Sequence, residues 1–137
     1  MKLTVKLDYA CRALAQLAKR YEGREVSRIE ELANAEEIPS KYLAQILGEL
    51  RNGGLVESRR GKQGGYLLAR APEDISLHDV ISLIEGGLFS GVSQSAGESG
   101  DAVADAWNRL QNAFEKSAKA VTLKDLASRP VEEMYYI

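Results

Sequence analysis

Residues 36–70 read EEIPSKYLAQILGELRNGGLVESRRGKQGGYLLAR, and this stretch decides the fold. Its first half predicts an amphipathic helix, because apolar side chains recur there at intervals of three and four residues. The helix is expected to begin at Pro39, whose fixed φ and missing N–H suit a first turn, and to end near Asn52, before a pair of glycines. Its apolar face holds Tyr42, Leu43, Ile46, Leu47 and Leu50.

The second half of the same stretch predicts a β-hairpin. Runs 55–58 and 66–69 are typical of two short paired strands. Their connection, 59–65, contains three glycines and three cations, so the hairpin is expected to have a tight, positively charged tip. We call residues 55–69 the wing.

The sequence before this stretch predicts two more helices. The first spans 7–21, where apolar residues follow the helical interval. A brief strand at Glu25-Val26 is expected before the second helix. That helix opens at Ser27, which has the S-x-x-E spacing of a capping box, and runs to about Ala35. A tight turn then leads to the helix at Pro39, and two helices joined in this way make a helix-turn-helix candidate.

After the wing, Ser76 is expected to cap a fourth helix that ends near Glu85. Residues 86–100 contain five glycines and four serines, which predicts a flexible loop. A long helix over 101–121 follows, and a short last helix is expected to be capped by Thr122 with Asp125 three positions on.

These elements predict a mainly α-helical fold with one small β-hairpin. A winged helix-turn-helix domain is expected at 1–72, and a dimerisation and regulatory region with the C-terminal tail at 73–137.

The chain carries a formal charge of −2, but residues 41–70 hold six cations against two carboxylates, so positive charge gathers around the wing. No apolar run is long enough for a membrane span, and a lone cysteine, Cys11, excludes an internal disulfide. We therefore expect a cytoplasmic protein.

A recognition helix followed by a basic wing predicts binding to double-stranded DNA. Hydroxyl, ammonium, phenol and amide groups at the start of the helix suit base edges and phosphates, and the cations of the wing suit phosphates or a minor groove. Taken singly, such a helix or a charged hairpin tip is often an ordinary solvated surface. A nucleotide-binding loop is excluded because the motif G-x-x-x-x-G-K-[ST] is absent. The predicted DNA-binding residues are Arg28, Ser40, Lys41, Tyr42, Gln45, Arg51, Arg59, Arg60, Lys62, Gln63, Gly64, Gly65 and Tyr66.

The long helix predicts a homodimer. Its apolar stripe is too long for one small domain to cover easily, so a second copy is the expected partner, with packing inside the monomer as the alternative. A twofold dimer would present two recognition helices to a palindromic operator. The predicted dimerisation residues are Val103, Trp107, Leu110, Phe114 and Val121.

Little else in the chain suggests chemistry. Cys11 is interpreted as a packing residue of the first helix, with a redox-sensing thiol as the minority interpretation. His78 has no second metal ligand in view, and one histidine with one cysteine cannot supply a nucleophile, a base and an orienting group. We therefore predict neither an enzyme nor a bound cofactor.

Motifs spread over nearly the whole chain resemble the Rrf-type winged-helix transcription regulators. They are MKL at 1–3 with Tyr9-Ala10, YLAQIL at 42–47, LRNGGLV at 50–56, Arg60-Gly61, GGY at 64–66 and IEG at 84–86. In cluster-binding members of this family, the loop before the long helix carries three cysteines. Residues 86–100 contain neither cysteine nor histidine, so the resemblance implies a member without an iron–sulfur cluster.

Within that family, residues 122–128 and the terminal Tyr136-Ile137 look most like the cysteine-metabolism repressor. The resemblance therefore implies a repressor of cysteine or sulfur genes, with cysteine synthase as a partner. Tyr136 and Ile137 are the predicted partner-binding residues, because a free terminal isoleucine can dock in that enzyme's active site. A tail folded onto the dimer is the alternative, and a module that binds only the enzyme and no DNA is a second interpretation of the chain.

Overall fold

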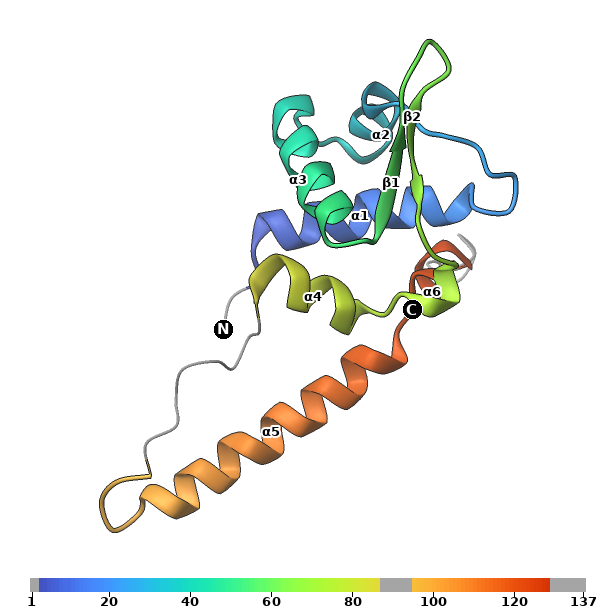
Figure 1. Ribbon diagram of the computed structural model, residues 1–137. Coiled ribbons are helices and arrows are strands. Elements are labelled where there is room, and N and C mark those ends of the chain that lie inside the picture. The colour runs from blue at the N-terminus through green and yellow to red at the C-terminus, as the bar shows by residue number, and fades with distance from the viewer. Residues whose placement is uncertain (1–2, 87–94, 129–137) are drawn as a thin grey trace, which may run out of the picture.

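The computed structural model describes residues 3–86 and 95–128. The shorter helices and the wing form a body, and the long helix leads away from it (Figure 1). The helices are α1 (Val5–Lys19), α2 (Ile29–Glu36), α3 (Ser40–Asn52), α4 (Leu77–Glu85), α5 (Gly100–Ala120) and α6 (Leu123–Ser128), and a 3-10 turn, η1, spans Pro72–Asp74. Strands β1 (Val56–Arg59) and β2 (Gly65–Leu68) pair antiparallel. The predicted fold class, mainly α with one hairpin, is confirmed.

One hydrophobic core joins α1, α3 and the wing. Helix α1 contributes a face of leucines and alanines, and α3 buries the face that its spacing predicts, except for the half-buried Tyr42. The core continues past residue 72, because Ile75, Val80 and Leu123 are buried in the same cluster. The fully buried side chains of α3 are Leu43, Ile46, Leu47 and Leu50.

Three helix starts show how local hydrogen bonds set the boundaries. Helix α1 begins earlier than predicted because the side chain of Thr4 caps it. At α4 the predicted cap is confirmed, since Asp79 N–H donates to Ser76 Oγ at 3.2 Å and Ser76 N–H donates to Asp79 Oδ2 at 2.9 Å. The predicted cap of α6 is confirmed too, because Asp125 N–H donates to Thr122 Oγ1 at 3.4 Å and Thr122 N–H donates to Asp125 Oδ2 at 2.9 Å.

The capping box predicted at Ser27 is wrong. Helix α2 begins after Arg28 and has no side-chain cap. Ser27 is instead fully buried, and its backbone N–H and C=O each bond to Tyr66 of the wing at 2.8 Å. Its hydroxyl accepts a hydrogen bond from Arg20 at 3.2 Å. Buried backbone groups need partners and the wing supplies them here, so the strand predicted at Glu25-Val26 is replaced by a single bridge at Ser27.

Candidate nucleic-acid interface

Helix α3 carries the predicted reading face. Pro39 is its N-cap residue and Ser40 its first helical residue, one position later than predicted. The side chains of Ser40, Lys41 and Gln45 are exposed. The first turn contains no acidic residue, so the partial positive charge of the helix N-terminus can attract a phosphate.

Two contacts with α1 favour binding of a nucleic acid to α3. The ring of Tyr42 packs edge-on against Tyr9, with centroids 5.6 Å apart, which fixes the direction of its phenol. Glu49, the acidic residue of α3, forms an ion pair with Lys6 at 2.7 Å. The pair partly neutralises a carboxylate that would otherwise repel a nucleic-acid backbone.

Two glycines shape the backbone of the wing. A β-carbon at Gly64 would lie 2.2 Å from the carbonyl oxygen of Arg59, and one at Gly65 would lie 2.6 Å from the carbonyl oxygen of Ser27. The first glycine therefore allows the tip of the wing to close. The second allows β2 to approach Ser27 and form the bridge that holds the wing against the start of α2.

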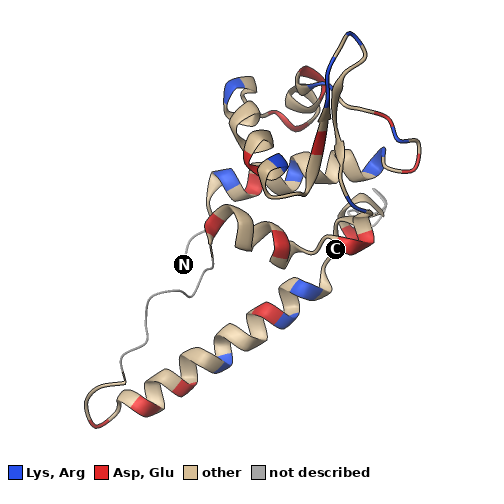
Figure 2. Cartoon of the chain, in the orientation of Figure 1, with Lys and Arg blue, Asp and Glu red and all other residues tan. Residues whose placement is uncertain are grey.

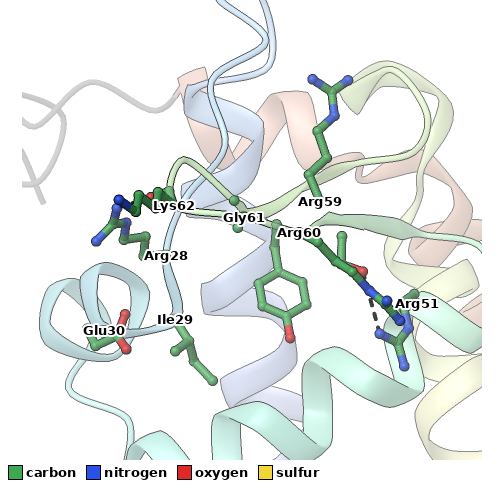
Figure 3. A pocket seen from close by; sticks show the side chains of 12 residues that line it. Arg28, Ile29, Glu30, Arg51, Arg59, Arg60, Gly61 and Lys62 are labelled. Carbon is green, nitrogen blue, oxygen red and sulfur yellow. Dashed lines mark hydrogen bonds between the residues drawn. The ribbon is translucent and has the colours of Figure 1, made fainter.

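An open groove of about 730 Å³ lies between the wing and the start of α2. Figure 3 shows Arg28 and Lys62 together at one end, where Arg28 Nη2 donates to the Lys62 carbonyl, and Arg51 beside Arg60 at the other. Arg51 also donates to Ser58 Oγ at 3.5 Å. The cationic residues that line the groove are Arg28, Arg51, Arg59, Arg60 and Lys62, and the one carboxylate that lines it is Glu30. This cationic groove suits the phosphates of a nucleic acid.

Arg59 and Arg60 point to opposite sides of the wing. Figure 3 shows Arg60 directed toward Arg51, and Arg59, the last residue of β1, directed away from it. From the sequence, the two arginines were predicted to act as one cationic cluster. In the structure, Arg60 lines the cationic groove, whereas Arg59 lines both this groove and a second cavity. Gln63 is exposed at the tip, and the half-buried Tyr66 lines the groove.

Two parts of the predicted DNA-binding surface lie on the same end of the molecule. The start of α3 and the tip of the wing are both at the top of Figure 1, and Lys and Arg mark both places in Figure 2. Sequence reasoning missed Arg20, whose Nη1 lies 2.8 Å from Glu31 Oε2 and 3.2 Å from Ser27 Oγ. The hydrogen bond from Arg20 lowers the pKa of Glu31. Arg20 thus holds Ser27, the residue to which the wing is hydrogen-bonded, and no local sequence pattern predicts this contact.

Helix α5 presents an apolar stripe to solvent. Val103, Trp107 and Leu110 are 50%, 48% and 54% exposed, while Phe114 and Val121 are half-buried. Helix α5 packs against α4 and leads away from the body (Figure 1). Although it is long, neither α5 nor any other helix within residues 3–86 and 95–128 is apolar enough to cross a membrane.

Known proteins share this arrangement. The model of the Rrf2 family, described as an iron-dependent transcriptional regulator, matches residues 3–129. The chain belongs to the Rrf2 family. It is 34% identical to the HTH-type transcriptional regulator CymR of Bacillus subtilis, and the alignment covers 100% of both chains. The solved structure of B. subtilis CymR has a TM-score of 0.82 at 32% identity, covering 93% of this chain and 97% of that one. The T. potens IscR structure has a TM-score of 0.76 at 31% identity, covering 99% and 97%.

Membership of the Rrf2 family makes the chain a DNA-binding transcription regulator, and the prediction that it is not an enzyme is confirmed. The family description raises the question of iron. Cys11 and His78 are the sole cysteine and histidine of the sequence, and they lie on α1 and α4. In the described part of the chain, no three His, Cys, Asp or Glu side chains are placed to hold a metal ion. Iron–sulfur clusters are held mainly by cysteine thiolates, so these residues do not fit one.

Proposed function

We propose that two copies of this Rrf2-family chain form a homodimer that binds a palindromic DNA operator and represses genes of cysteine or sulfur metabolism. The observation that carries the proposal is the cationic groove beside the recognition helix. There Arg28, Arg51, Arg60 and Lys62 converge from the start of α2, the end of α3 and the wing, with a single carboxylate among the groove's lining residues.

The wing and α3 have separate roles in this proposal. Arg60 and Lys62 bind phosphates, and Arg59 and Gln63 reach the backbone or the minor groove beside the wing. These contacts fix the position of α3 in the major groove but carry no sequence information. On α3, Gln45 reads base edges, since its amide can pair bidentately with adenine.

Support for the homodimer comes from the stripe on α5. Trp107 and its neighbours expose about half of their surface, and large apolar side chains that share one exposed face favour association with another protein surface. A second copy presents the same stripe, so the two can cover each other about a twofold axis. The two recognition helices are then related by the same axis, as a palindrome requires.

Support for a role in cysteine metabolism comes from the match to CymR, whose solved structure is described as that of the global cysteine regulator of B. subtilis. The match spans both chains completely. We propose a regulator without an iron–sulfur cluster, because residues 86–100 offer neither cysteine nor histidine. Docking on cysteine synthase through Tyr136 and Ile137 stays a prediction, because both lie outside the described residues.

DNA binding is expected to weaken steeply with salt. Roughly 6–8 neutralised phosphates give a slope of about −5 to −7 when the logarithm of affinity is plotted against the logarithm of salt concentration. Selection from random duplexes, followed by anisotropy titration of the selected duplex over a salt series, measures both the palindrome and the slope. An affinity that stays level between low and moderate salt would contradict the proposal.

Cys11 is expected to be an unreactive thiol rather than a redox sensor. Burial and, to a smaller extent, the nearby charge of Asp8 raise its pKa from 9.0 to about 11, so about one molecule in ten thousand carries the thiolate at neutral pH. A disulfide reagent should therefore modify the folded protein far more slowly than the denatured one, and peroxide should leave DNA binding unchanged. A rapid peroxide response that Cys11→Ser abolishes would reverse this conclusion.

The same shift predicts how stability depends on pH. The folded thiol keeps its proton to a higher pH than the unfolded thiol, whose pKa is near 9.0. The unfolded state therefore binds fewer protons between these two values, and the contribution of Cys11 to stability falls as pH rises above about 9. Urea titrations at several alkaline pH values, with Cys11→Ser as the control, measure this contribution.

A further inference from the structure

A second cavity, of about 120 Å³, lies on the other side of the wing from the cationic groove. In the strand register Glu57 faces Leu67, and both line this cavity, whereas the next pair, Ser58 and Tyr66, lines the groove. The end of α1 and the turn after it close the cavity from below. Its floor is apolar and buried, formed by Leu17, Leu67 and Leu68.

The rim of this rear cavity carries both signs of charge. Arg20, Arg24 and Arg59 line it together with Glu25 and Glu57. Arg20 is already bound to Glu31 and Ser27. Within residues 3–86 and 95–128, no ion pair joins the other four rim residues to any partner. Two guanidinium groups and two carboxylates therefore surround a small apolar floor without neutralising one another.

We propose that the rear cavity binds a small free α-amino acid. Arg24 and Arg59 would hold its carboxylate, and Glu25 and Glu57 its ammonium group. A bare anion is repelled by the two carboxylates and a bare cation by the guanidinium groups, whereas a zwitterion satisfies both sets of charges. Pockets for drug-sized ligands hold about 300–1,000 Å³, so a cavity of about 120 Å³ admits only a ligand with a short side chain.

Binding there would act on DNA recognition through Arg59, which lines both the rear cavity and the cationic groove. A ligand carboxylate draws this guanidinium to the back of the wing and offsets its charge. The positive field in front of the wing then falls, and affinity for a phosphate backbone falls with it. This consequence rests on the proposed DNA-binding function, whereas binding of the amino acid does not.

Calorimetric titration of the purified full chain with L-alanine and with L-serine tests the site directly. We expect saturable binding of one molecule per chain. Sodium acetate and ethylammonium chloride, which each carry half of the zwitterion, should give no saturable heat. Arg24→Gln and Glu57→Gln should each weaken binding at least about tenfold, which corresponds to about 1.4 kcal/mol. Lys19→Gln removes a charge from an exposed position near the same end of α1, outside the cavity lining, and should bind as the parent does.

Three results would overturn the site: no saturable binding up to roughly 10 mM amino acid, equal binding of acetate, or unchanged binding in both variants. The regulatory consequence has its own readout. Saturating L-alanine should weaken DNA binding several-fold for the parent chain and leave Arg24→Gln unaffected. Amino-acid binding with no change in DNA affinity would overturn this second step, while a chain that binds L-alanine but never DNA would refute only the proposed function.

Discussion

Replacing Arg60 and Lys62 by alanine is expected to weaken DNA binding on the order of 100-fold at low salt, and by a similar factor for every duplex sequence. Both side chains line the cationic groove and are exposed, so their loss removes charge without opening the core. Because a dimer carries each substitution twice, about four phosphate contacts disappear. The log–log salt slope should then become shallower by about 3.6.

Anisotropy titrations with the selected operator and with a scrambled duplex measure both effects. The matched control replaces Lys119 and Lys124, which are exposed on α5 and α6 and do not line the groove, so that the same charge is removed elsewhere. The control should keep the parent slope. A slope that changes equally in both double variants would mean that total charge, rather than the groove, governs binding. A slope that changes in neither would remove the groove from the interface.

The recognition helix and the wing could be predicted from the sequence because their signals are local. The three-and-four spacing from Tyr42 to Leu50 fixes which face of α3 is buried, and the glycine pair at 53–54 fixes where it ends. Caps such as Ser76 were found for the same reason, since donor and acceptor lie three residues apart. The buried face of a helix and the bonds of its first turn depend little on the rest of the fold.

The errors arose where distant segments meet. Ser27 has the spacing of a cap, but its backbone pairs with Tyr66, and a buried bridge across the fold outweighs a local side-chain cap. Arg59 and Arg60 are adjacent in sequence and both line the groove, yet Arg59 also lines the second cavity and Arg60 does not. The joining of Arg28 to Lys62, and hence the shape of the groove, depends on how the wing folds back over α2. None of these contacts joins residues at a fixed spacing along the chain, so no sequence pattern predicts them.

Replacing Trp107 and Leu110 by glutamate is expected to convert the proposed dimer to monomers and to weaken operator binding by more than about 100-fold. These two side chains are the centre of the exposed stripe on α5. Four carboxylates in one apolar twofold interface would be buried without partners, at a cost that such an interface cannot recover. A dimer holds its second recognition helix at high effective concentration over the adjacent half-site, and a monomer loses that gain.

Sedimentation gives the mass, and titration against the full palindrome and against one half-site gives the two affinities. Half-site affinity should be nearly unchanged, because the cationic groove and α3 lie in the body, away from the stripe (Figure 1). Circular dichroism separates loss of association from loss of folding.

Asn112→Glu is the matched control, because it adds a carboxylate to the same helix at an exposed position outside the stripe and should remain dimeric. A double variant that stays dimeric would place the subunit contact elsewhere on the chain. A double variant that is monomeric yet binds the palindrome as tightly as the parent would mean that each subunit reads DNA alone.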